Sequence, residues 1–307
     1  MKTVVYIGDF AQPFDTEKYI AEALEELGYR VVRVNERKFF LRLIDEVINE
    51  IVYYKPSLVL FSKGRPLGDA EVFIERLKGL GVPTACWLFD LYFDLPSPRI
   101  GKLKRKEAPF NCETIFSTDG GHDNDFKLIG IKHKLLRQGI YEPEAILYDR
   151  PKTKDVIFVG SDSFGNRAKM LDGLKKRYGK RFEWHGYETS IRNLPLNELY
   201  ATAKVVVGDS FPSSRYWSNR IYETLGRGGF LLHPHVEGIE EEFEDGKHLV
   251  LYKRGDMDDL YTKIDYYLSH DEEREKIRVA GFEHVKNNYT YKHRCIELMK
   301  NYEPKTK

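Results

Sequence analysis

The stretch VIFVGS, residues 156–161, repeats near the middle of the chain the form of VVYIGD, residues 4–9. Each is an apolar run that ends in glycine, and each is followed by a loop and a segment with helical spacing. Uninterrupted apolar runs are typical of strands that a parallel sheet buries on both faces. The repeat therefore predicts two domains of the same architecture in tandem.

The segments on either side of this repeat alternate between strand and helix patterns. The predicted strands are TVVYIG, RVVRV, PSLVLFS, VPTACWLFD, ETIFSTD and HKLLRQG before it, and RFEWHG, AKVVVGDS, GFLLHP and HLVLY after it. Strands that alternate with helices form parallel sheets with helices on both faces. We therefore expect an α/β fold of two tandem doubly wound, Rossmann-like domains facing across a cleft. The polar segment 148–155 is the predicted linker, which gives domains of residues 1–150 and 151–307.

Composition narrows the class of protein. With 41% hydrophobic and 32% charged residues, the chain is typical of globular rather than disordered proteins. The 49 basic and 48 acidic residues nearly cancel, so no overall attraction to nucleic acid is indicated. No apolar run approaches the roughly 20 residues of a membrane helix, and the first strand does not have the form of a signal peptide. The three cysteines lack metal-ligand or disulfide spacing, so we expect reduced thiols in a cytoplasmic protein.

The stretch YWSNRIYETLGRGGFLLHP, residues 216–234, places polar residues before a glycine-rich turn and a strand. Ser218 or Asn219 is suited to cap a helix that begins near Arg220. The N–H groups of such a helix entry attract anions, and Arg220 and Arg167 are suited to bind a diphosphate. The alternative is structural: Ser218 only caps the helix, and Arg167 is a solvated side chain.

Glu223 lies about one turn inside the same predicted helix. Its carboxylate can accept two hydrogen bonds from a ribose diol, whereas the structural alternative is a surface ion pair with Arg220. Other candidates follow strands, where open α/β sheets bind ligands. Gly160 follows the first strand of the second half, and the backbone near Gly186 is placed to pair with a nucleobase. Tyr187 or Trp184 would stack on that base; a core position is the alternative for Trp184.

Three stretches in the second half together resemble a known family. They are FVGS…NRAKML, WHGYE…LPLNELYATAKVVVGDS and WSNRIYETLGRGGFLLHPHVEGIEEEFEDGKHLVLY. In order and spacing they resemble the donor-binding domain of GT-B glycosyltransferases, in the glycosyltransferase group 1 family and its CgeB-like, spore-maturation branch. The similarity covers roughly residues 155–295 well and the first half more loosely.

The resemblance implies a function for each domain. It implies that Glu223 binds the donor ribose, that residues 151–307 bind a nucleotide diphosphate sugar, and that residues 1–150 hold the acceptor side. A UDP-sugar is the expected donor and a hydroxyl group in the cleft is the expected acceptor. The family further implies no tightly bound cofactor, no metal, and a last helix that crosses back to the first domain.

One position departs from the family pattern. Many retaining members have a glutamate eight positions before the ribose-binding one, and here that position is Arg215. We expect Arg215 to stabilise the leaving diphosphate, because a cation suits developing negative charge. The choice between a retaining and an inverting mechanism stays open.

An inverting reaction needs a base on the acceptor side. In the first half, WLFDLYFD and STDGGHDND place acidic residues and a histidine after strands. Asp90 is the first candidate for the base and His122 the second. Asp94, Asp119 and Asp123 lie nearby in sequence, and an aspartate after a strand also commonly caps a turn. The spacing of this group does not match a known set of metal ligands.

Three other functions remain open. The basic segment 98–109, with Arg99, Lys102, Lys104, Arg105 and Lys106, is typical of a solvated loop. It would also suit phosphate contacts in a phage-type DNA glycosyltransferase acting on hydroxymethylated bases. A nucleotide-sugar epimerase of the same fold and a non-catalytic sugar-nucleotide-binding protein are the other two alternatives.

Overall fold

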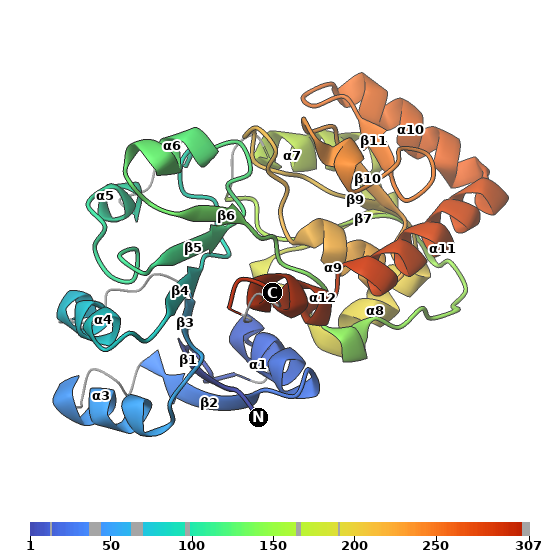
Figure 1. Cartoon of the computed structure of the whole chain (residues 1–307). Helices are drawn as coiled ribbons and strands as arrows, with labels where there is room; N and C mark the ends of the chain where they lie inside the picture. Colours follow the sequence, from blue (N-terminus) through green and yellow to red (C-terminus); the bar gives the residue numbers. More distant parts are fainter. Residues whose placement is uncertain are drawn as a thin grey trace. The chain divides into compact units, whose positions relative to one another are not determined.

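The computed structural model describes residues 1–12, 14–36, 44–62, 70–95, 99–163, 167–189 and 191–302, except for the side chains of Ala70, Arg99 and Tyr187. These residues form two compact units (Figure 1): Met1–Gln138 with Tyr291–Lys307, and Gly139–Thr290. Each unit has a parallel sheet with helices. The predicted α/β class with two doubly wound units is therefore confirmed.

The first unit is built on a six-stranded sheet with the order β2-β1-β3-β4-β5-β6. Every neighbouring pair is parallel. The strands are β1 (Thr3–Gly8), β2 (Arg30–Asn35), β3 (Leu58–Ser62), β4 (Thr84–Trp87), β5 (Thr114–Ser117) and β6 (His133–Leu135). The helices are α1 (Thr16–Glu26), α3 (Ile44–Tyr53), α4 (Ala70–Gly79), α5 (Arg99–Lys104), α6 (Asp123–Leu128) and α12 (Tyr291–Met299).

The apolar runs of the first unit are its central strands. Every residue of β1 and β3 is buried, as the uninterrupted apolar patterns predict for inner parallel strands. The C-terminal helix α12 belongs to this unit and packs against α1 (Figure 1). Its Tyr291 ring lies 6.0 Å from that of Tyr19, and the Cys295 thiol contacts the carbonyl of Ile20 at 3.7 Å.

The second unit contains a five-stranded parallel sheet with the order β11-β10-β9-β7-β8. Its strands are β7 (Lys154–Val159), β8 (Phe182–His185), β9 (Ala203–Val207), β10 (Leu231–Pro234) and β11 (Val250–Tyr252). Its α-helices are α7 (Arg167–Tyr178), α8 (Asn193–Thr202), α9 (Arg220–Gly226), α10 (Met257–Ser269) and α11 (Asp271–Asn288). Its described residues also form the 3-10 turns η1 (Glu142–Glu144), η2 (Gly179–Arg181), η3 (Tyr187–Thr189) and η4 (Ile239–Glu241).

Helices cover both faces of the second sheet. Apolar residues of α7 and α10 pack on one face, and those of α8, α9 and α11 pack on the other. Ile140 and Ala145 are also buried in this second core. Gly226 makes room for Ile140, because a Cβ at position 226 would lie 2.9 Å from that side chain. This packing places the unit boundary at Gln138, ahead of the linker predicted from sequence.

The described residues also bear on the sequence predictions about membrane helices and cysteines. No helix among them is long and apolar enough to cross a membrane. All three cysteines are buried free thiols.

The close contact between α11 and the loop before β11 gives a first test. A Cβ at Gly281 would collide with the backbone carbonyl of His248. We expect Gly281→Ala to destabilise the second unit by about 1–3 kcal/mol, because backbone must move to relieve the overlap. Thermal unfolding should show a lower melting temperature.

Gly79→Ala is the matched control for this substitution. Gly79 is likewise a helical glycine, the last residue of α4, but nothing lies within 4 Å of its Cβ position, and alanine favours helix there. If both variants melt at the same temperature, the tight contact at Gly281 is refuted.

Candidate functional site

Two arginines meet at the strand ends of the second unit. The Arg167 Nε donates to Asp209 Oδ2 at 2.9 Å, and its Nη1 donates to the carbonyl of Ser161 at 2.8 Å. Arg220, the first residue of α9, directs Nη1 to the carbonyl of Asp209 at 3.4 Å. Both guanidinium groups lie over the Phe158 ring, at 5.7 and 5.2 Å from its centroid. The fold therefore brings together Arg167 and Arg220, which are 53 positions apart in sequence.

The two arginines carry two positive charges, and Asp209 supplies only one negative charge to balance them. Burial lowers the pKa of Arg220 and the neighbouring charge of Arg167 adds to this effect, yet a guanidinium remains protonated in proteins. Among the residues described, Arg220 forms no ion pair, whereas Arg167 is paired with Asp209. An anionic ligand would therefore complete the charge balance.

Gly160 makes this arrangement possible. It follows β7 with φ of 141°, a conformation that favours glycine. A Cβ there would collide with the guanidinium of Arg220. The predicted site residues Gly160, Arg167 and Arg220 thus lie together at one strand end.

Glu223 is held on the first turns of α9 by a buried arginine. Its Oε2 accepts from Arg227 Nε at 2.8 Å, and its Oε1 accepts from Asn219 Nδ2 at 3.3 Å. The Glu223 side chain is 23% exposed, whereas that of Arg227 is only 3% exposed. The buried Arg227 therefore orients the Glu223 carboxylate, which remains accessible to a ligand. The alternative of a surface ion pair between Glu223 and Arg220 is wrong, because Arg227 is the partner.

Arg227 connects α9 to distant parts of the second unit. Besides Glu223 it pairs with Glu144 of η1 and donates to Asn197 Oδ1 of α8 at 2.7 Å. Burial opposes the charge of Arg227, but the two carboxylates outweigh burial and raise its pKa. Sequence reasoning missed Arg227, since GRGG indicates only a turn and its partners lie far away along the chain.

The predicted capping of α9 by Ser218 or Asn219 is wrong. Asn219 occupies the N-cap position with helical backbone angles, φ −54° and ψ −19°, and its side chain makes no capping bond. Its amide nitrogen is directed to Glu223 instead. Within the described part of the chain, Ser218 Oγ and Asn219 Oδ1 are buried without a hydrogen-bond partner. Both atoms can therefore serve a ligand.

The loop after β8 holds the residues predicted to contact a base. Gly186 follows this strand directly. Trp184 is 44% exposed, so the alternative of a core position is wrong. Its Nε1 donates to the carbonyl of Gly160 at 2.8 Å. The side chain of Tyr187 lies outside the described residues.

Arg215 is turned toward the loop after β10. Its Nη1 and Nη2 bind the two oxygens of Glu241, at 2.7 and 2.5 Å. The backbone of Arg215 has φ of 53°, and Gly238 faces its guanidinium, where a Cβ would lie 2.9 Å from Nη1. The cation is thus fixed by a bidentate ion pair.

Another buried group lies at these strand ends, although sequence reasoning assigned it no role. His233 of β10 is 1% exposed; its Nδ1 lies 2.8 Å from the carbonyl of Pro234, and its Nε2 is buried without a partner in the described structure. Burial lowers the pKa of His233 to about 3, with Arg254 and Arg220 adding to the shift. The imidazole is therefore neutral at physiological pH.

In the first unit, His122 is the centre of an acidic cluster. Its Nδ1 lies 2.8 Å from Asp125 Oδ2, and its Nε2 lies 3.1 Å from Asp94 Oδ2. The imidazole stacks on Phe93, with centroids 4.8 Å apart. Burial alone would lower the pKa of His122, but the bonds to Asp125 and Asp94 raise it above its ordinary value.

Two further aspartates differ in their surroundings. Asp119 is fully buried, and its Oδ1 accepts the N–H groups of Tyr92 and Phe93 at 2.8 and 3.0 Å. Burial raises the pKa of Asp119. Asp90 follows β4 and is exposed. Within the described residues, no group of three His, Cys, Asp or Glu side chains is placed to hold a metal ion.

The basic segment 98–109 contributes the short helix α5. Arg105 is partly neutralised, since its Nε pairs with Glu107 at 2.6 Å. Pro98 lies outside the described residues, as does the side chain of Arg99.

The sequence itself matches a known family in its second half. Residues 167–300 match the family described as glycosyl transferase-like. The CgeB-like branch stays a prediction. No curated protein matches the chain.

Solved structures resemble the chain along almost its whole length. A glycosyltransferase from Rickettsia africae has 12% identity and a TM-score of 0.68, over 98% of this chain and 97% of that one. HepE from Anabaena in complex with UDP-glucose has 13% identity and a TM-score of 0.65, over 98% and 99%. Sucrose-phosphate synthase from Thermosynechococcus elongatus has 14% identity and a TM-score of 0.64, over 98% of both chains. The chain therefore has the GT-B fold, and its residues 167–300 are glycosyl transferase-like in sequence.

Proposed function

We propose that this protein is a glycosyltransferase that moves a sugar from a nucleotide diphosphate sugar to a hydroxyl acceptor. The proposal rests on one observation: a cationic centre and an oriented carboxylate both lie at one end of the second sheet. Arg220 and Arg167 form the centre, and Glu223 on Arg227 is the carboxylate. The glycosyl transferase-like match of residues 167–300 covers all four of these side chains.

The diphosphate of the donor would bind at Arg220. This guanidinium lacks a described ion-pair partner, and the buried hydroxyl of Ser218 lies two residues earlier in the chain. Binding the donor would thus satisfy both a buried charge and a buried polar atom. The ribose diol would donate to Glu223, whose carboxylate Arg227 holds in place. The backbone at Gly186, with Tyr187, would contact the base.

A UDP-sugar is the donor that we propose. HepE, which shares this fold, has been solved with UDP-glucose, and this supports the choice without deciding the sugar. We retain Asp90 as the base that accepts the proton of the acceptor hydroxyl. His122 suits this role less well, because two carboxylates favour its protonated form. A charged His122 would instead orient Asp94.

A donor screen tests the proposed function. We expect UDP-sugars to raise the melting temperature more than GDP-, ADP- or TDP-sugars, with about 2.7 kcal/mol of stabilisation at a hundredfold excess over Kd. Hydroxyl acceptors should then release UDP. Arg220→Gln should weaken UDP binding much more than uridine binding, whereas Arg150→Gln, at an exposed ion pair with Glu198, should change neither.

Two results of this screen would contradict glycosyl transfer. Conversion of UDP-N-acetylglucosamine to another sugar nucleotide without an acceptor would identify an epimerase. Donor binding without turnover across the acceptor panel would identify a binding protein.

Arg215 provides a test of the chemical step. If its guanidinium stabilises the leaving diphosphate, Arg215→Ala should lower kcat about a hundredfold with little change in donor affinity, as for other groups that stabilise developing charge. Glu241→Gln removes the partner of Arg215 and should reduce kcat less. Steady-state kinetics and donor titration decide the matter. Equal losses of rate and affinity in Arg215→Ala would show a binding role only.

The acceptor-side cluster predicts a pH dependence. Because its pKa is raised, His122 contributes stability below its unfolded pKa of about 6.5 and loses that contribution as pH rises through the folded pKa. NMR titration should therefore show an imidazole that deprotonates above about pH 6.5. Asp94→Asn should lower this pKa.

Asp123→Asn is the matched control, because Asp123 pairs with His133 rather than with His122. A His122 titration below the ordinary histidine range, or one that Asp94→Asn leaves unchanged, would contradict the cluster.

A further inference from the structure

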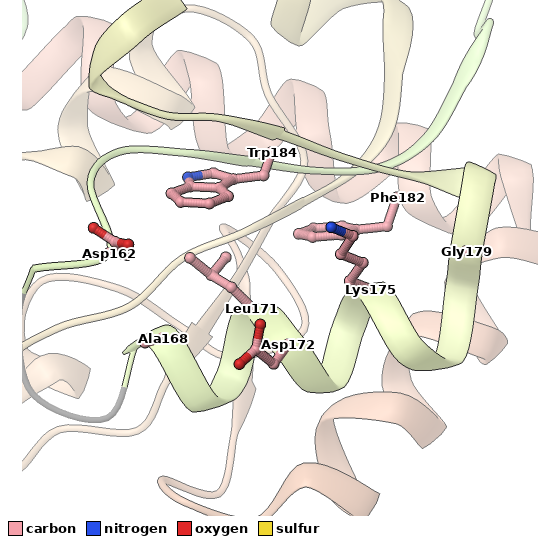
Figure 2. Close-up of a pocket in the computed structure, with 8 residues that line it drawn as sticks. All are labelled: Asp162, Ala168, Leu171, Asp172, Lys175, Gly179, Phe182 and Trp184. Carbon is pink, nitrogen blue, oxygen red and sulfur yellow. The ribbon is translucent and has the colours of Figure 1, made fainter.

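A cavity opens on the second unit, between α7 and the edge strand β8. It has a volume of about 440 Å³, and Figure 2 shows the side chains that line it. Trp184 and Phe182 come from β8, and Leu171, Asp172 and Lys175 come from α7. None of these side chains belongs to the cluster formed by Arg167, Arg220 and Glu223, where the diphosphate and the ribose would bind.

Trp184 presents a fixed aromatic surface to this cavity. Its Nε1 is bonded to the carbonyl of Gly160 at 2.8 Å. Gly186 approaches the same ring closely, since a Cβ at that position would lie 3.3 Å from Cε2 and Cζ2. The side chain nevertheless remains 44% exposed. A large aromatic side chain that is already held in place loses little conformational entropy when a ligand packs on it.

The rest of the lining divides into an apolar floor and a charged rim. Leu171 and Phe182 are buried, with 4% and 9% exposure. Asp162, Asp172 and Lys175 are exposed, and no described residue forms an ion pair with Asp172 or Lys175. Two carboxylates and one ammonium group are therefore available around an apolar surface.

These features match the chemistry of a sugar ring. A pyranose has C–H groups on its faces, which can pack on the indole and on Leu171. Its hydroxyls both donate and accept hydrogen bonds, so carboxylates and an ammonium group can bind them together. The rim carries one more negative than positive charge, and this net charge repels the phosphates of a nucleotide.

We propose that this cavity is a saccharide-binding subsite, separate from the donor site, that holds a sugar residue of a glycan against Trp184. The subsite would anchor a glycan to the second unit while the donor site remains occupied. It goes beyond the proposed transfer reaction and does not depend on turnover, because its lining side chains are not those proposed to bind the diphosphate and the ribose.

Tryptophan fluorescence and calorimetry test the proposal. The probes are maltotriose, cellobiose and N,N′-diacetylchitobiose, titrated into the full chain with UDP present at saturation. Of the three tryptophans, Trp87 and Trp217 are 0% and 1% exposed, so a change in emission reports on Trp184. We expect at least one probe to bind. Trp184→Ala should weaken that probe about tenfold, and Trp184→Phe, which keeps an aromatic ring, should weaken it less.

Variants on α7 separate a loss of binding from a loss of folding. Asp172→Asn and Lys175→Gln lie on the exposed rim and should each weaken the probe about threefold, the effect of losing one hydrogen bond. Lys176→Gln is the matched control, because Lys176 is also exposed on α7 but does not line the cavity. UDP affinity, measured on Asp172→Asn, Lys175→Gln and Lys176→Gln, should not change.

Four outcomes would overturn the proposal. They are the absence of binding by any of the three saccharides, binding that Trp184→Ala and the rim variants leave unchanged, displacement of the saccharide by UDP, and tighter binding of tetramethylammonium than of any saccharide. The last would identify a cation site. Loss of UDP binding or turnover with intact saccharide binding would refute the proposed function alone.

Discussion

The second unit depends on the interactions of one buried guanidinium, that of Arg227. It joins Glu223 of α9, Asn197 of α8 and Glu144 of η1, three elements that are well separated along the chain. Removing one partner of such a buried network leaves a charge without compensation, and this typically costs about 3–5 kcal/mol. The network therefore serves two purposes: it closes the segment around Glu144 onto the second core, and it fixes the direction of the Glu223 carboxylate.

The opposite charges of the site lie on the same short helix. Arg220 begins α9 and Glu223 follows one turn later, yet the two do not pair with each other. Arg227 holds the carboxylate, and Gly160 allows the guanidinium of Arg220 to lie against the end of β7. This separation keeps one cation and one carboxylate available at once. A nucleotide diphosphate needs both, because it carries an anionic group and a diol that donates hydrogen bonds.

The fold, and the convergence of some residues of the candidate site, could be predicted from sequence for reasons that are local. Apolar runs such as VVYI and VIFV become inner parallel strands because both faces of these strands are covered. Gly160, Arg167, Arg220 and Glu223 follow strands or begin helices, so their convergence follows from the sheet topology.

The remaining features depend on contacts between segments that no local pattern relates. The Arg227 network requires residues 144, 197 and 223 together. The unit boundary at Gln138 follows from the burial of Ile140 in the second core. Capping of α9 was predicted from residue type alone, but the Asn219 amide bonds to Glu223 instead. The exposure of Trp184 could not be predicted either, because an aromatic residue in a strand pattern is consistent with a core position.

The most direct measurement compares the affinities of UDP and 2′,3′-dideoxy-UDP in the wild-type chain and in Glu223→Gln, by calorimetry. If Glu223 accepts hydrogen bonds from the ribose diol, the wild type should bind UDP about tenfold or more tightly than the dideoxy analogue. Glu223→Gln should largely lose this preference and still bind the dideoxy analogue as the wild type does. An equal preference for UDP in both proteins would contradict the account.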